Sequence, residues 1–179
     1  MDSELEVLKK YLKEDSLIKH CIATAGIMGE VAKKLGGDER LWFTIGLLHD
    51  VDYELCNGDM QKHGILAEEI LKKEGYGEIA EVVKRHNHHL FGNYGSAVEI
   101  ALQASDSISG LVIACALVKG GSISDVTAKT VKKKFKEKSF AAGCDRERIR
   151  MIEKLMPLEE FFEIAIKGVA SVKDYLGLR

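Results

Sequence analysis

The sequence contains a single proline among its 179 residues. Proline interrupts helices because it lacks a backbone N–H and clashes with the preceding turn, so its scarcity leaves long helices unbroken. Apolar residues also recur three or four positions apart along nearly the whole chain, which is the period of a helix with one buried face. Together these features predict an all-α protein of about eight to nine helices.

Paired cysteines are absent as well, and no secretory leader is expected. The four cysteines (Cys21, Cys56, Cys115 and Cys144) lack the spacing of a disulfide framework or a zinc finger. We therefore expect reduced intracellular thiols. Residues 1–4 are acidic and are not followed by the apolar segment of a secretory signal. A cytoplasmic protein is expected.

The chain also has little net charge and no long uninterrupted apolar run. A net charge of −2 provides no basic field, so no nucleic-acid partner is expected. The run from Leu111 to Val118 is too short to cross a bilayer, so no membrane partner is expected either. With 46% hydrophobic and 30% charged residues, the composition is that of an ordinary globular domain. No linker or repeat divides the chain.

Histidine and aspartate stand out against this background. All six histidines lie between residues 20 and 89, and an apolar run that begins at Leu41 ends in the adjacent pair His49 and Asp50. Burying an imidazole and a carboxylate there is costly unless a partner satisfies them. A metal ion does so, because it binds a neutral imidazole nitrogen and an ionised carboxylate together.

Two more candidate ligands lie on predicted helices. His20 shares the inward face of a helix expected over residues 16–35, and Asp106 lies in the middle of an apolar helix that starts near Ser96. A buried carboxylate without a partner costs several kcal/mol. Hydrogen bonds within the core, or a lysine beside Asp106, are the alternatives to a metal at these two positions.

The ordered series His20, His49-Asp50 and Asp106 resembles the HD superfamily of metal-dependent phosphohydrolases, over roughly residues 15–120. The resemblance implies one all-α HD-domain helical bundle. It would span residues 1–179, with the metal-binding core at about 15–120 and C-terminal helices at about 124–177 packed on it.

His63 and His86 resemble the additional ligands of family members that hold two metals. In that case Asp50 would bridge the ions through its two oxygens. Alternatively, both histidines line the cleft around a single metal. The implied cofactor is one or two divalent transition-metal ions, with iron, manganese, nickel, cobalt and zinc as candidates.

Neighbouring polar residues are candidates for supporting roles. Asp52, with Asp50, is assigned to catalysis, because it can orient metal-bound water or a ligand histidine; solvent-facing loop carboxylates are the alternative. Lys62, Arg85 and His88 are assigned to substrate binding, with a solvated surface as the alternative.

Two further segments refine the resemblance. The segment 138–143 is similar to a pattern of HDIG-type predicted hydrolases without an assigned function. Gly75-Tyr76-Gly77 lacks the proline of the family members that cleave cyclic dinucleotides, which disfavours that substrate. The lysines from Lys132 to Lys138 form either a solvated face or an electrostatic collar for an anionic substrate.

The predicted activity is hydrolysis of a phosphomonoester or phosphodiester in a nucleotide or a nucleotide derivative, with a metal-activated water as the attacking group. The expected partner is therefore a small-molecule phosphate ester, and a homodimer is left open. Two other functions stay open: an HD-fold di-iron oxygenase, and a non-catalytic module that senses nucleotides or mediates interactions.

Overall fold

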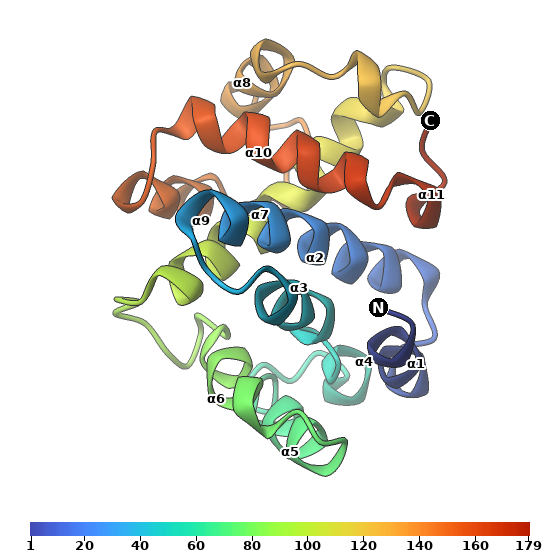
Figure 1. The fold of residues 1–179 in the computed structure, drawn as a ribbon, viewed down its shortest axis with the longest axis vertical. Coiled ribbons are helices and arrows are strands. Elements are labelled where there is room, and N and C mark those ends of the chain that lie inside the picture. The colour runs from blue at the N-terminus through green and yellow to red at the C-terminus, as the bar shows by residue number, and fades with distance from the viewer.

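The computed structural model describes residues 1–179 and confirms an all-α fold, with eleven α-helices, two short 3₁₀-helices and no strand (Figure 1). The helix count exceeds the eight to nine expected. Two of the α-helices, Tyr53–Cys56 and Lys173–Leu176, have four residues each, and so short a helix shows no apolar period in the sequence.

The helices follow one another with short connections. In chain order they are α1 (Asp2–Tyr11), α2 (Asp15–Leu35), α3 (Glu39–Leu48), α4 (Tyr53–Cys56), α5 (Ile65–Lys73), α6 (Gly77–Arg85), α7 (Ala97–Leu117), the 3₁₀-helix Ile123–Asp125, α8 (Ala128–Lys136), α9 (Arg146–Arg150), the 3₁₀-helix Met151–Lys154, α10 (Leu158–Ser171) and α11 (Lys173–Leu176).

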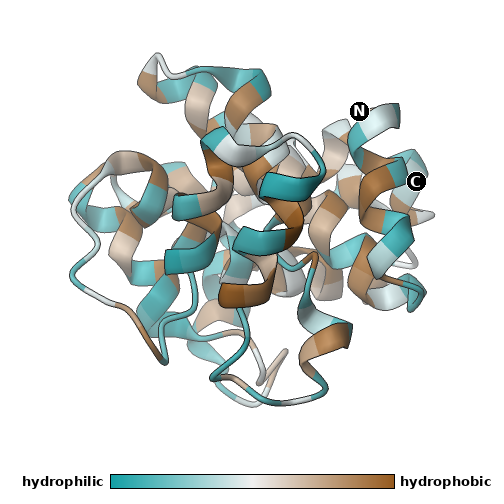
Figure 2. Cartoon of the chain, turned by 90° about the horizontal axis from the view of Figure 1, so that it is seen from below, coloured by the Kyte–Doolittle hydropathy of each residue, from teal (hydrophilic) through white to brown (hydrophobic).

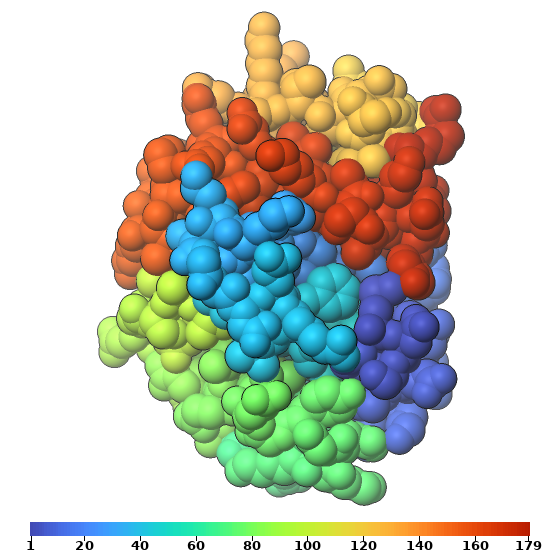
Figure 3. Space-filling model, in the orientation of Figure 1, coloured from blue at the N-terminus to red at the C-terminus, as the bar shows by residue number.

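Helix α2 lies at the centre of the arrangement. It packs against α3, α7 and α10, while α5 and α6 pack on each other. Figure 1 shows α10 running alongside α2, with the α5–α6 pair at one end of the molecule and α8 at the other. The space-filling view shows the same order on the surface, from the α8 region through α10 and α3 to α5 (Figure 3).

Two glycines bring the backbones of α2 and α10 into contact. A Cβ on Gly26 would lie 2.2 Å from the carbonyl oxygen of Gly168, and a Cβ on Gly168 would lie 2.5 Å from the Cα of Ile27. Neither position has room for a side chain. The crossing fixes α2, which carries His20, against the C-terminal part of the chain.

The core is one cluster of 44 buried residues that extends from Leu5 to Leu178. Helices with both hydrophobic and hydrophilic residues surround it (Figure 2). By length and composition α7 could cross a membrane, although 72% of its most apolar window is buried inside the fold. A single helix of this kind is also what the core of a globular protein contains.

Capping residues set the starts of two helices. Asp38 and Ser96 cap α3 and α7 by accepting hydrogen bonds from backbone N–H groups, and the cap at Ser96 agrees with the predicted start of the apolar helix. The segment between α3 and α5 contains the short helix α4. Helix α5 begins at Ile65, so His63 lies just before it.

Candidate metal centre

Eight of the ten predicted site residues come together around one cavity. The cavity measures about 320 Å³ and is lined by Leu17, His20, Asp50, Tyr53, Met60, His63, His86, Asn87, His88, His89, Asp106 and Arg148. His49 and Asp52 lie directly beneath this lining and are fully buried. Lys62 and Arg85 do not reach the cavity.

Helix termini supply most of the converging side chains. His49 caps the C-terminus of α3 and Asp50 follows it, while His86 caps the C-terminus of α6. His20 and Asp106 instead project from within α2 and α7. Asp106 is a carboxylate within an apolar helix, so it needs a charged partner.

The first ligand group joins His20, His49, Asp50 and Asp106. Nε2 of His20 lies 3.2 Å from Nε2 of His49 and 2.9 Å from Oδ1 of Asp106. Nε2 of His49 lies 3.4 Å from both Oδ2 of Asp50 and Oδ1 of Asp106. Oδ2 of Asp50 is 3.6 Å from Nε2 of His20. All four ligand atoms therefore face a common point.

The second ligand group shares Asp50 with the first. Its other oxygen, Oδ1, lies 3.4 Å from Nε2 of His63 and 3.2 Å from Nε2 of His86. The two imidazole nitrogens are 3.1 Å apart. The carboxylate of Asp50 thus presents one oxygen to each group, which is the arrangement of a bridging ligand.

Every histidine in the two groups has its other ring nitrogen engaged. Nδ1 of His49 donates to the carbonyl of Gly46 at 2.7 Å, and Nδ1 of His86 donates to the carbonyl of Val83. Nδ1 of His63 donates to Oδ1 of Asp52 at 2.8 Å. These acceptors fix a proton on Nδ1, so the Nε2 lone pair is available at the centre.

The Nδ1 atom of His20 is also engaged, in this case by a serine hydroxyl. The hydroxyl of Ser109 donates to the carbonyl of Asp106 at 3.0 Å, so its oxygen is free to accept from Nδ1 of His20 at 3.1 Å. All four imidazoles therefore direct Nε2 into the site.

The spacing of the ligand atoms fits a metal ion. Ligands about 2.1 Å from a cation lie about 3.0 Å apart at octahedral angles and about 3.4 Å apart at tetrahedral angles. The separations within the two groups run from 2.9 to 3.6 Å. Two Nε2 atoms that face each other at 3.2 Å repel when both carry a proton and also when neither does. A cation between them removes this conflict, so the residues present fit divalent metal ions.

The charges of the site also favour a cation. Burial alone would lower the pKa of His49, but the carboxylates of Asp50 and Asp106 outweigh it and raise that pKa to about 9. Burial acts on Asp106 in the opposite direction, yet Arg148 and the histidines hold its pKa well below the usual value. Against the effect of burial, His49 and His86 likewise lower the pKa of Asp50. Both carboxylates are thus ionised and require positive charge beside them.

Asp52 orients His63, a member of the second ligand group, through a hydrogen bond. Burial tends to lower the pKa of His63, but the hydrogen bond to Asp52 and the charge of Asp50 raise it. The second oxygen of Asp52 accepts from the backbone N–H of Gly64 at 2.7 Å and of Ala67 at 3.0 Å. With both oxygens occupied, Asp52 holds the His63 ring and does not face the cavity.

The turn around His63 depends on Gly64 and Asn87. Gly64 has a φ of +87°, and a Cβ there would lie 2.4 Å from the carbonyl oxygen of Lys84, so only glycine fits. The buried amide of Asn87 donates to the carbonyls of Met60 at 2.7 Å and His63 at 2.9 Å. Asn87 therefore ties the loop before α5 to the loop after α6.

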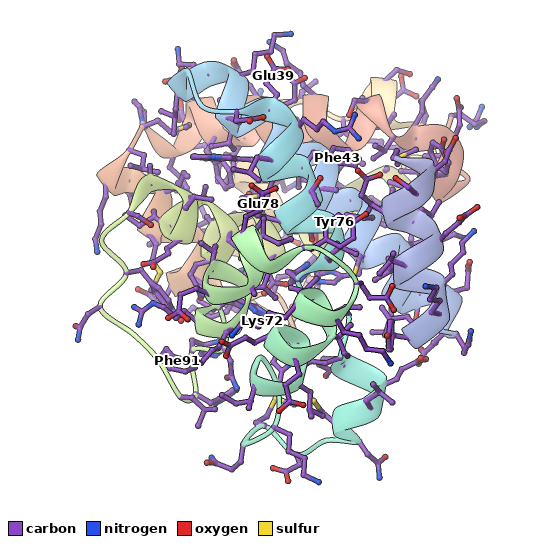
Figure 4. The ribbon with its side chains drawn as sticks, turned by 60° about the horizontal axis from the view of Figure 1, so that its bottom comes forward. Glu39, Phe43, Lys72, Tyr76, Glu78 and Phe91 are labelled. Atoms are coloured by element: carbon purple, nitrogen blue, oxygen red, sulfur yellow. The ribbon has the colours of Figure 1, made fainter.

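The predicted substrate-binding residues take different places. Lys62 is exposed and points toward Asp59. Arg85 donates to Glu99 of α7 and to the carbonyl of Gly92. Its guanidinium lies 5.7 Å from the centre of the ring of Phe91, a residue on the loop after α6 that Figure 4 labels. Arg85 thus shapes that loop rather than the cavity.

His88 is the one of the three that lines the cavity. Burial, together with the positive charge of Arg148, lowers the pKa of His88. The lysine run on α8 contributes no residue to the lining. Lys132 and Lys134 pair with Glu159 and Glu137.

Arg148 also lines the cavity, although the sequence does not indicate it. Its Nη2 donates to Oδ2 of Asp106 and its Nε donates to Oε1 of Gln103, both at 2.7 Å. Gln103 in turn donates to the carbonyl of His86 at 2.8 Å. The sequence around Arg148 is rich in charge, and nothing in it distinguishes this arginine from its neighbours.

A family model described as "HD domain" matches residues 17–117, which is more than half of the chain and contains all six proposed ligands. The chain belongs to the HD domain family. The resemblance drawn from His20, His49-Asp50 and Asp106 is thereby confirmed, and the His/Asp cluster matches a metal-dependent hydrolase family.

Curated relatives of this HD domain are distant. The Ribonuclease Y proteins of Oleidesulfovibrio alaskensis and Lawsonia intracellularis are 30% and 32% identical over 96 residues, which make up 53% of this chain and 18% of each relative. Ribonuclease Y of Clostridium botulinum is 29% identical over 163 residues, or 90% of this chain and 29% of that protein. The chain thus spans less than a third of these relatives. No solved structure matches it.

Proposed function

We propose that the chain is a metal-dependent phosphohydrolase that cleaves a phosphomonoester or phosphodiester of a nucleotide or nucleotide derivative. The observation that carries the proposal is the placement of Asp50, whose two oxygens face two separate groups of imidazoles. Asp50 would help to hold a cation in each group, and two cations would supply the positioning and neutralisation of charge that phosphoryl transfer needs more than covalent chemistry.

The chain offers two places for a metal. His20, His49, Asp106 and Oδ2 of Asp50 would hold one ion, and His63, His86 and Oδ1 of Asp50 would hold a second. A divalent ion bound there lowers the pKa of a coordinated water molecule and neutralises phosphate oxygens. The identity of the ions and their number are part of the proposal.

The remaining residues prepare the site before substrate arrives. The Nδ1 partners of the four histidines, which include the carboxylate of Asp52, hold the imidazole rings in a fixed orientation. Asp52 therefore acts through His63. Asp50 and Asp106 stay ionised. Their oxygens can therefore bind a cation without first losing a proton.

The apolar part of the cavity lining favours a nucleotide substrate. It consists of Leu17, Tyr53 and Met60, and the ring of Tyr53 packs edge-on against His63 with centroids 5.6 Å apart. An aromatic side chain beside a phosphate-binding centre can stack on a base. The dimensions of the cavity suit a small molecule.

A phosphate-release screen tests the proposal. The purified protein is incubated with manganese, cobalt or nickel and with a panel of nucleotides and other phosphate esters, and Asp50→Ala serves as the control. We expect the wild-type protein to release phosphate or a nucleotide from at least one ester, and Asp50→Ala to release neither. Two bound irons with oxygen consumption would favour an oxygenase instead. A metal-loaded protein inert on the whole panel would favour a nucleotide-sensing module.

RNA is a second candidate substrate, because the matched relatives are Ribonuclease Y proteins. Cleavage of a single-stranded oligoribonucleotide in the same screen, with little activity on mononucleotides, would favour it. We rank it second because the chain has a net charge of −2 and the lysines of α8 do not line the cavity. The cytoplasmic location and the homodimer stay predictions.

A further inference from the structure

Arg148 is the single arginine or lysine among the twelve residues that line the cavity. The rest of the lining is histidine, aspartate, asparagine and three apolar residues. A phosphate ester brings at least one negative charge to a site that already holds Asp50 and Asp106. The permanent positive charge of Arg148 is therefore the protein's own counter-charge for such a ligand.

The guanidinium is held in place before any ligand binds. Nη2 donates to Asp106 and Nε donates to Gln103, each at 2.7 Å. Because Gln103 is fixed by the carbonyl of His86, the arginine connects the two ligand groups through α7. An arginine fixed in this way loses little further rotamer freedom when it binds an anion.

One nitrogen of the Arg148 guanidinium has no hydrogen-bond partner within the chain. Nη1 of Arg148 makes no hydrogen bond within the chain, although the side chain is only 12% exposed. Arg148 lines the cavity, and because Nε and Nη2 are occupied by Gln103 and Asp106, Nη1 is the part of the planar guanidinium that is left for a ligand. Phosphate oxygens are the acceptors that this geometry suits best.

Arg148 also comes from outside the segment that defines the family. The HD domain match ends at residue 117, and α9 places Arg148 in the cavity because Asp145 caps that helix and Ile149 anchors it in the core. The C-terminal part of the chain thus completes a site whose ligands all lie upstream.

We propose that Arg148 binds the phosphate group of the substrate through Nη1 while it holds Asp106 through Nη2. The inference deepens the proposed function, because it assigns the residue that recognises the anion. It differs from the sequence-based assignment to Lys62 and Arg85, which lie away from the cavity.

Binding of inorganic phosphate tests this inference without turnover. The protein is saturated with manganese, its metal content is measured, and phosphate is titrated by calorimetry. We expect Arg148→Met to weaken phosphate binding by about tenfold to a hundredfold, the effect of losing a charge-assisted hydrogen bond. Arg150→Met is the matched control, because Arg150 lies on the same helix, is half exposed and pairs with Glu153. It should change the affinity less than about twofold.

A conservative variant separates anion binding from support of Asp106. Arg148→Lys keeps the charge but lacks the fork, so we expect phosphate to bind severalfold more weakly at full metal occupancy. Unchanged phosphate affinity in Arg148→Met contradicts the inference. If Arg148→Met does not bind metal, unchanged affinity in Arg148→Lys contradicts it instead. A protein that binds phosphate through Arg148 yet hydrolyses nothing contradicts the proposed function alone.

Discussion

The imidazole of His63 donates its Nδ1 proton to the buried carboxylate of Asp52 at 2.8 Å. Asp52 has no exposed surface, and its second oxygen accepts two backbone N–H groups at the start of α5. The ring of His63 is therefore oriented by the same carboxylate that caps the following helix. Metal affinity at the second ligand group should depend on this contact.

Asp52→Asn tests that dependence. An amide has one oxygen, so it cannot accept from His63 and from the backbone N–H groups of α5 together. An amide N–H that faces Nδ1 would favour the other imidazole tautomer, which removes the Nε2 lone pair from the centre. We expect metal affinity at the second group to fall about tenfold to a hundredfold, as measured by metal titration.

Asp59→Asn is the control for this substitution. Asp59 lies on the loop after α4, is half exposed and pairs loosely with Lys62. It should leave metal binding unchanged. An Asp52→Asn protein that binds two metals as tightly as the wild type would show that the orientation of His63 does not need a carboxylate.

Metal removal should destabilise the fold. Two ionised carboxylates and four imidazoles lie within one small region, and a ligand that binds only the folded state stabilises it by about 2.7 kcal/mol at a hundred times its Kd. We expect chelation to lower Tm and manganese to restore it in a concentration-dependent way. Thermal scans of Asp50→Ala, with and without metal, should then coincide. A wild-type Tm that does not respond to metal would contradict the fit of the site to a cation.

The crossing of α2 and α10 predicts a strong steric effect. A methyl group at Gly168 would meet the backbone of Ile27 at 2.5 Å, so Gly168→Ala should lower the free energy of unfolding by about 1–3 kcal/mol or more. Denaturant unfolding measures the change.

Gly29→Ala is the matched substitution on α2. Its Cβ would lie 3.7 Å from the ring of Phe43 and 3.9 Å from the carbonyl oxygen of Glu39, and both are ordinary contact distances. Since alanine favours a helix over glycine by about 1 kcal/mol, this variant should be as stable as the wild type or more so. If Gly29→Ala and Gly168→Ala changed the free energy of unfolding equally, the backbones of α2 and α10 would be less closely packed than the structure shows.

The sequence is informative where it places polar side chains among apolar ones, because burying them without a partner costs free energy. His49 and Asp50 at the end of an apolar run, and Asp106 within an apolar helix, are expensive to bury alone. This cost indicates a shared partner, and the structure places Nε2 of His49 3.4 Å from one oxygen of each carboxylate. The helical fold followed from periodicity and from the scarcity of proline.

Long-range partners were not visible in the sequence. Arg148 lies 42 residues after Asp106, and no local pattern shows which of several arginines turns inward. Ser109 and Gln103 look like ordinary polar positions on an apolar helix, yet they hold His20 and Arg148. Lys62 and Arg85 adjoin proposed ligands in the sequence, but neighbours in sequence point in different directions around a helix or a turn.

Metal analysis of protein purified without added metal tests the central claim most directly. The wild-type chain and Asp50→Ala are prepared in parallel, and their metal content is measured by mass spectrometry. We expect one or two divalent transition-metal ions per wild-type chain, and nearly none in the variant, because Asp50 contributes an oxygen to both ligand groups. An Asp50→Ala protein that keeps its fold and the full wild-type metal content would contradict the account.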